Sequence, residues 1–242
     1  MVNSRKWVVA RAIAAACLFA CLGVVSAAGQ QLDAASVIQR VDAAVKARID
    51  HIAAYTVTEH YAVYRGKDET QPAAEMTVRT EYKAETGKSY TILSQSGSEF
   101  IRNHVLNTIL DSEKTINLPG IREHSWFTSA NYEMNLKSGV VERLDERDCV
   151  ALTIVPKRKA PNMIEGTLWV DAKDGSIVRI DGSASQSPSI FVGPAHVMRQ
   201  YVNMNGYSMA TQARATSDSF LLGRTIVTID YRDYQFQLRP AP

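Results

Sequence analysis

Two periodicities divide most of this chain. From Asp33 onward, apolar residues recur three and four positions apart while charged residues fill most of the other face, which predicts an amphipathic helix with Asp33 as its N-cap. The apolar positions of this helix are Val37, Ile38, Val41, Val45, Ile49 and Ile52. From Tyr55 the repeat becomes two, and the alternation of apolar and polar residues is typical of antiparallel strands with one solvated face.

Strand patterns account for most of the rest. We expect strands at 55–63, 76–84, 89–95, 131–137, 140–145, 149–156, 165–171, 176–182, 196–204, 207–217 and 225–237. The dipeptides Asp174-Gly175 and Asn205-Gly206 favour tight hairpin turns, and Ser138-Gly139 is a weaker signal of the same kind. Sequential hairpins without βαβ alternation predict one α+β, mostly β domain with a single curled antiparallel sheet of about eleven strands.

A second helical pattern interrupts the strands between about Ser98 and Glu113. A sheet of this size must curl and have its apolar face covered, and the N-terminal helix and this second helix are the available covers. Tight packing would give a plain core, whereas loose packing would leave a cavity for an apolar ligand. The residues alone leave both outcomes open.

Apolar strand positions are the candidates for lining such a cavity. These candidate ligand-binding residues are Val57, Tyr61, Val63, Met76, Val78, Tyr82, Tyr90 and Ile92. The candidate lid residues on the second helix are Phe100, Ile101, Val105 and Ile109. Glu59 is the one acid on the otherwise apolar face of the first strand, and it is interpreted either as a partnered strand residue or as a polar anchor inside a ligand cavity.

The first 28 residues have the parts of a secretory signal peptide. A basic start with Arg5, Lys6 and Arg11 precedes an apolar stretch at 12–25, which is shorter than the ~20 residues needed to cross a bilayer as a helix. We therefore expect cleavage near Ala27 or Ala28, which leaves one domain at 29–242. The run 18–21, which ends at Cys21, resembles a lipobox and leaves a membrane-anchored lipoprotein as a minor alternative.

Loss of this leader changes the charge and the cysteine count. The 242-residue chain has 27 Lys and Arg against 25 Asp and Glu, and removal of three basic residues leaves 24 against 25, a net charge of −1. Such a balance in an exported protein argues against nucleic acid as a partner. Of three cysteines only Cys149 remains, inside the apolar run 149–155, and we expect a buried structural thiol.

Catalytic motifs are absent from the sequence. It contains no G-x-S-x-G, no phosphate-binding glycine-rich loop, no H-E-x-x-H and no C-x-x-C, and its five histidines are far apart. We therefore expect no enzymatic activity, no metal site and no cofactor. The basic cluster 157–159 is interpreted as a solvated loop, with attraction to anionic headgroups or a partner as the alternative.

One strand pair carries a family resemblance. The segments 168–175 (LWVDAKDG) and 177–182 (IVRIDG) resemble the hallmark strand pair of LolA/LolB-like outer membrane lipoprotein-sorting proteins. The segments 155–159, 187–189 and 228–234 also fit an uncharacterised periplasmic branch of that family, whereas 207–210 departs from it. The resemblance implies a periplasmic, unclosed β-barrel whose concave apolar face is capped by helices and accommodates acyl chains.

The leading hypothesis is a non-enzymatic, monomeric periplasmic carrier or binding protein for lipid or lipoprotein acyl chains in outer-membrane lipoprotein sorting. Burial of each acyl methylene would contribute roughly 0.8 kcal/mol, so no catalytic group is needed for affinity. Inner- or outer-membrane sorting components would be its partners. The alternative is a periplasmic sensor or interaction module of the RseB-like type, which binds lipid or protein tails and reports to a membrane partner.

Overall fold

A computed structural model describes residues 32–66, 69–187, 194–219 and 223–240; the predicted leader lies outside the described residues. The strands are β1 (Ile52–Arg65), β2 (Ala74–Lys83), β3 (Gly87–Gly97), β4 (Tyr132–Leu144), β5 (Arg147–Pro156), β6 (Ile164–Asp171), β7 (Ile177–Ala184), β8 (His196–Met204), β9 (Tyr207–Ser219) and β10 (Gly223–Leu238). The helices are α1 (Ala34–His51), α2 (Glu99–Ile101), the π-helical turn η1 (Arg102–Leu106), α3 (Asn107–Ile116) and the 3-10 helix η2 (Arg122–Ser125).

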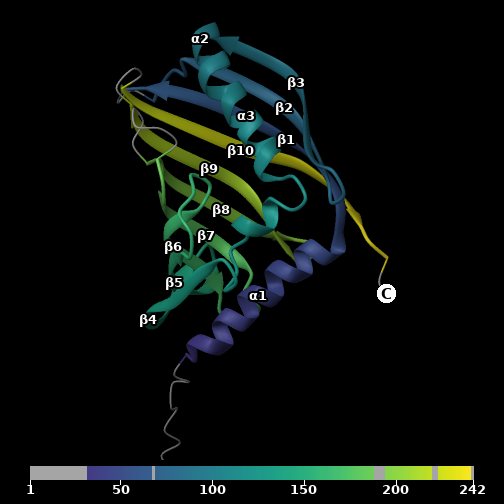
Figure 1. Cartoon of the computed structure of the whole chain (residues 1–242), viewed down its shortest axis with the longest axis vertical. Helices are drawn as coiled ribbons and strands as arrows, with labels where there is room; N and C mark the ends of the chain where they lie inside the picture. The colour runs from purple at the N-terminus through teal and green to yellow at the C-terminus, as the bar shows by residue number, and fades with distance from the viewer. Residues whose placement is uncertain (1–31, 67–68, 188–193, 220–222, 241–242) are drawn as a thin grey trace, which may run out of the picture. The chain divides into compact units, whose positions relative to one another are not determined.

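The strands form one antiparallel sheet of ten strands in the order β3-β2-β1-β10-β9-β8-β7-β6-β5-β4 (Figure 1). Strands adjacent in sequence pair with each other except β3 and β4, and β10 also pairs with β1, which joins β1–β3 to β4–β9. Within the described residues, the edge strands β3 and β4 do not pair with each other, so the sheet stays open. The structure thus confirms the predicted single, unclosed antiparallel sheet.

The strand count differs slightly from the predicted one, and the reason lies in β4. The segments 131–137 and 140–145 belong to one strand with an irregular register between Leu136 and Val141, because Gly139 does not take the positive φ of a tight turn. The hairpin turn comes later instead, at Asp145 and Glu146, with φ of 46° and 65°. The predicted turn at Asn205-Gly206 is confirmed by positive φ at both of its residues.

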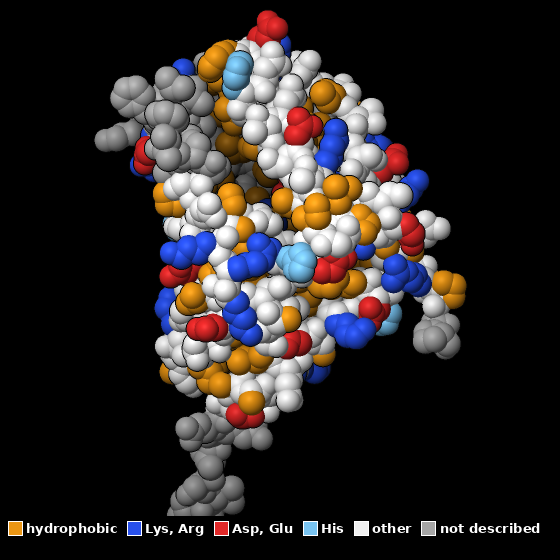
Figure 2. All heavy atoms as spheres, viewed as in Figure 1, with side chains coloured by type: hydrophobic (Ala, Val, Ile, Leu, Met, Phe, Trp, Pro, Cys, Tyr) orange, Lys and Arg blue, Asp and Glu red, His pale blue; other side chains and the backbone are white. Residues whose placement is uncertain are grey.

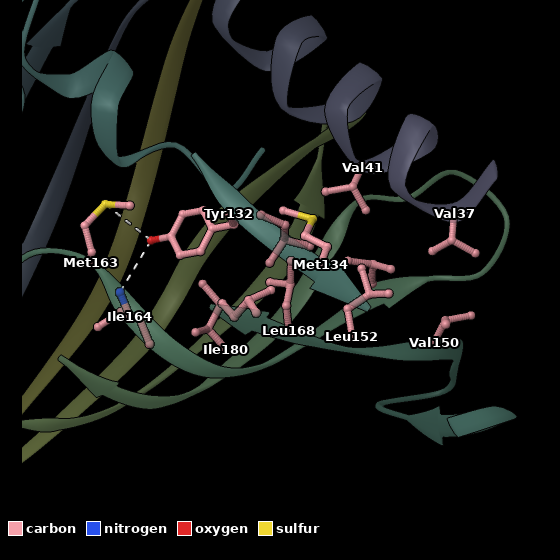
Figure 3. Packing of buried hydrophobic residues seen from close by; sticks show 13 residues of the cluster. Val37, Val41, Tyr132, Met134, Val150, Leu152, Met163, Ile164, Leu168 and Ile180 are labelled. Carbon is pink, nitrogen blue, oxygen red and sulfur yellow. Dashed lines mark hydrogen bonds between the residues drawn. The ribbon is translucent and has the colours of Figure 1, made fainter. Parts of the chain in front are cut away.

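Helix α1 covers one part of the sheet. Asp33 caps its first turn by accepting hydrogen bonds from the backbone N–H groups of Ala35 and Ser36, as its sequence position predicts. Figure 3 shows Val37 and Val41 of α1 directed towards side chains of β4 and β5. We call this cluster the α1 core; its buried members are Val37, Val41, Tyr132, Met134, Val150, Leu152, Ile154, Met163, Ile164, Leu168, Val170, Ile177 and Ile180.

The segment α2–η1–α3, which we call the lid segment, covers a different part of the sheet from α1. Its buried residues pack against β1, β2 and β10 in a second cluster, the lid core: Tyr61, Val63, Ala74, Met76, Val78, Ile101, Leu106, Leu110 and Val227. In Figure 1 the two covers lie over different strands of the same face of the sheet. The predicted covering of the sheet by two helical segments is therefore confirmed, and each cover has its own core.

The turn between β6 and β7 contacts the backbone of α1 at Gly175, so stability should be sensitive to any side chain at this position. A Cβ at Gly175 (φ +73°) would lie 2.4 Å from the carbonyl carbon of Arg40 and 2.6 Å from the nitrogen of Val41. We expect Gly175→Ala to lower the free energy of unfolding by about 3 kcal/mol, because backbone strain adds to displacement of α1. Urea unfolding followed by circular dichroism measures this loss.

Gly206→Ala is the matched control. Gly206 also has a positive φ, +89°, but a Cβ there would meet nothing within 4 Å. The free energy of unfolding of this variant should fall by only about 1 kcal/mol, the cost of placing alanine at a positive φ. Equal losses for the two variants would contradict a close contact between the turn and α1.

Candidate functional site

A cavity of about 380 Å³ lies on the covered face of the sheet. Its walls come from both covers and from the sheet: α1, α3 and η2 on one side, and β1, β3 and β6–β10 on the other. Figure 2 shows this face hollowed beside the lid segment, with hydrophobic side chains in the hollow. The cavity therefore occupies space that neither helical cover fills.

The lining combines apolar and charged residues with four tyrosines and several neutral polar residues. The apolar residues are Ala44, Val45, Ile116, Trp126, Phe127, Pro161, Ile164, Ile177, Ile180, Val197, Met209 and Ala210. The charged residues are Arg48, Glu59, Lys88, Glu113, Arg122 and Arg199. Such a mixed lining suits a ligand that has both an apolar and a polar part.

Glu59 lies in this wall and is 2% exposed. Its Oε2 accepts a hydrogen bond from the Tyr61 hydroxyl, and in the sheet register it lies opposite Tyr231 of β10 and Val78 of β2. Burial raises the pKa of Tyr61 well above its ordinary value, and Glu59 adds to that shift, so the hydroxyl stays protonated and donates. Glu59 therefore has a protein partner and also lies in the wall of the cavity.

A second polar contact ties the lid segment to the edge strand. Lys88 Nζ of β3 lies 2.7 Å from Glu113 Oε2 of α3, and Asn117 Nδ2 donates to the same oxygen at 3.3 Å. Burial acts to raise the pKa of Glu113, but Lys88 and Arg199 outweigh it, and this pKa is lowered from its ordinary value. For Lys88, burial acts to lower the pKa, but Glu113 above all raises it well above the ordinary value. Both side chains are therefore ionised at neutral pH.

Three arginines complete the charged wall. Arg122 donates through Nη2 to the Ala84 carbonyl at 2.7 Å and through Nε to Glu123 at 3.1 Å. Burial acts to lower the pKa of Arg199, but Tyr201, Tyr231 and Glu113 raise it well above the ordinary value. Within the described residues, four buried polar atoms of the cavity wall have no hydrogen-bond partner: Arg48 Nε, Arg122 Nη1, Arg199 Nε and Ser208 Oγ.

The residues proposed from the sequence lie next to this cavity rather than in its wall. Tyr61, Val63, Met76, Val78 and Ile101 are buried in the lid core, and Tyr90, Val105 and Ile109 pack against it. Val57 and Tyr82 belong to a third cluster around Tyr55 and Met209. Ile92 and Phe100 are exposed, at 47% and 55%. The structure thus brings most candidate strand and lid residues together, in contact with one another.

Two of the residues that line the cavity are charged residues at inward-facing strand positions, where apolar residues are expected. Arg199 alternates with Val197 and Tyr201 along β8, so it is a charge on an inward-facing strand position, as Glu59 is on β1. Lys88 and Glu113 meet only in the folded chain. Their pairing has no counterpart in local sequence.

Other sequence predictions concern features outside the cavity. Cys149 is buried, and burial raises the pKa of its thiol, as expected of a structural cysteine. Lys157 and Arg158 of the basic cluster donate to the backbone carbonyls of Ser129 and His124 at 2.7 and 2.8 Å. In the described ranges we find neither a group of three or more metal-ligating side chains nor a helix long and apolar enough to span a membrane.

The fold and site together define a half-open antiparallel sheet with two helical covers and a cavity between them. No family model matches the chain, and no curated protein matches it. Solved structures with a similar fold include a LolA superfamily protein from Nitrosomonas europaea, with 12% identity, a TM-score of 0.43, and coverage of 87% of this chain and 96% of that one. The structural neighbours thus include the family that the sequence resembles.

Two further solved structures are similar. A domain described as an outer membrane lipoprotein-sorting protein, from Vibrio parahaemolyticus, shares 13% identity with a TM-score of 0.47 and covers 85% of this chain and 94% of its own. A DUF1329 family protein from Desulfovibrio piger shares 14% identity with a TM-score of 0.41 and covers 83% and 93%. All three TM-scores are below 0.5, so the function proposed below rests on the cavity and its lining.

Loss of the partly buried Lys88–Glu113 ion pair should destabilise the protein in a pH-dependent way. Glu113→Gln leaves Lys88 without its anion and should lower the free energy of unfolding by about 3 kcal/mol at pH 7. Because the pKa of Glu113 is lowered by folding, its contribution is complete above its ordinary pKa of 4.5 and disappears as the pH falls through the lower folded-state value. Urea unfolding at pH 7 and at successively lower pH should show the difference shrinking in acid.

Asp111→Asn is the control on the same helix. The Asp111 side chain is 77% exposed, and Lys114 lies 3.7 Å away, so this ion pair contributes little. A Glu113→Gln difference that did not change with pH would show that Glu113 acts by packing rather than by charge.

Proposed function

We propose that this protein is a non-enzymatic carrier or binding protein that holds a lipid or lipoprotein acyl chain in the cavity between the sheet, α1 and α3. The observation that supports this most is the cavity itself, about 380 Å³ with a wall that is partly apolar and partly polar, in the gap between two separate helical covers. This volume lies within the roughly 300–1,000 Å³ of ordinary ligand sites. The sequence adds a predicted export signal, which supports a periplasmic location.

Burial of hydrocarbon would supply the affinity. At roughly 0.8 kcal/mol per methylene, about ten buried methylenes contribute about 8 kcal/mol, which corresponds to micromolar binding before the cost of association is subtracted. This contribution needs no reacting group. It is compatible with repeated loading and release, as a carrier requires.

The lid segment is the element that we expect to move. It contains a π-helical turn between α2 and α3, and such turns interrupt the regular α-helical hydrogen bonding and are frequent at functional sites. The lid core beneath it contains many of the ligand-binding and lid residues expected from the sequence. We infer that these residues become part of an enlarged cavity when the lid segment lifts, and that the structure represents the closed arrangement.

A bulky residue in the cavity should block binding. Val197 of β8 lines the cavity, and Val197→Trp should weaken binding of a dansylated fatty acid at least tenfold by occupying the ligand's space. Fluorescence titration measures the affinity. Val202→Trp is the control, because Val202 lies on the same strand, is 41% exposed and is outside the lining. Equal affinity of both variants would contradict binding at this cavity.

Weakening the lid core should increase access to the interior. Ile109→Asp places a charge among the apolar residues that pack under α3 and should raise the fluorescence of a bound apolar probe severalfold in the still-folded protein. Ser112→Asp, at an exposed position of the same helix, is the matched control and should leave probe fluorescence unchanged. A lid that does not move would give equal fluorescence for the two variants.

A further inference from the structure

The cavity wall holds more positive than negative side chains. Four cationic side chains line it, against the two carboxyl groups of Glu59 and Glu113. Lys88 pairs with Glu113, and Arg122 pairs with Glu123. Within the described part of the chain, Arg48 and Arg199 form no such ion pair, and the Nε of each is buried without an acceptor.

We propose that the cavity selects an anionic amphiphile, whose carboxylate or phosphate group is bound by Arg199 and Arg48 while its apolar chain lies against the apolar wall. This inference rests on the proposed function and specifies the chemistry of the ligand's polar end. Guanidinium groups match both anions because they offer several N–H donors in one plane, and charge-assisted hydrogen bonds are about twice as strong as neutral ones.

Desolvation explains why an anion is favoured over a neutral head. A ligand that fills the cavity displaces the water that otherwise solvates Arg199 and Arg48. A neutral ligand would leave two guanidinium groups desolvated with no anion, which is strongly unfavourable, whereas an anion restores the lost interactions. Glu113 compensates the charge of Arg199 only in part, because its carboxylate also binds Lys88 and Asn117, and Glu59 accepts a hydrogen bond from Tyr61.

The two arginines reach the same cavity from different elements. Arg199 lies on β8, opposite Ile180 of β7 and Ala213 of β9 in the sheet register, so it is on the floor of the cavity. Arg48 belongs to α1, which lies across the cavity from this floor, so the two arginines line opposite walls. Ile180 and Val197, beside Arg199, belong to the apolar wall and would contact the first methylenes of the chain.

The test compares three ligands with the same twelve-carbon chain: dodecanoic acid, dodecyl phosphate and dodecanol. Each competes with the uncharged probe N-phenyl-1-naphthylamine for the full-length mature protein at pH 7.5. We expect at least one anionic ligand to displace the probe at a concentration at least tenfold lower than the concentration of dodecanol that is required. A stronger effect of the acid indicates a fatty acid as the natural source of the anion, and a stronger effect of the phosphate indicates a phospholipid headgroup.

Variants assign the preference to the arginines. Arg199→Gln and Arg48→Gln should each remove most of the preference for the anion and leave dodecanol binding within about twofold, which also shows that the variants fold. Arg199→Lys should keep part of the preference, because the charge remains. Arg79→Gln, at an exposed position of β2 outside the cavity, should change nothing.

Failure of the inference and failure of the proposed function give different results. If dodecanol binds as tightly as both anions to the wild-type protein, the anionic subsite is refuted while the apolar cavity stands. If none of the three ligands displaces the probe, the carrier function itself is refuted. A preference for the anion that survives in both glutamine variants would also overturn the assignment to Arg199 and Arg48.

Discussion

Coverage of one face of an open ten-stranded sheet is the constraint on which the rest of this structure depends. Ten strands spaced by about 4.8 Å give a sheet roughly 43 Å wide, whereas each 18-residue helical segment covers a strip only about 27 Å long and about 10 Å across. Two helical segments therefore cannot cover the whole face. In this protein they pack over separate groups of strands, and each builds its own core. The region between them remains as the cavity.

The buried charges become understandable once this gap is recognised. Glu59, Lys88, Glu113 and Arg199 lie on inward-facing positions that a solid core would fill with apolar side chains. Ionised groups are costly in such surroundings unless they are paired or reached by water or a ligand. The two carboxyl groups have protein partners, but Arg199 keeps a donor without an acceptor in the described residues. The anion proposed above would supply that acceptor.

Local patterns in the sequence predict the parts of this architecture that local physics determines. The Asp33 cap, the amphipathic α1 and the Asn205-Gly206 turn follow from side-chain chemistry within a few residues. The cavity lining does not, because alternation shows which face of a strand points inward but not how far along the sheet a helix extends. The Lys88–Glu113 contact joins residues that are 25 positions apart, and only the folded chain brings them together. Inward-facing charges are the usable signal in the sequence: Glu59 on β1 shows it clearly, and Arg199 on β8 carries it as well.

The most direct test of the account is a crystal structure of the protein with a fatty acid that carries bromine near the end of its chain. The account predicts one anomalous bromine peak inside the cavity, beside the apolar wall formed by Ile177, Ile180 and Val197, with carboxylate density next to Arg199. A bromine peak on the outer face of the sheet, or an occupied cavity whose carboxylate points away from Arg199 and Arg48 into solvent, would contradict it.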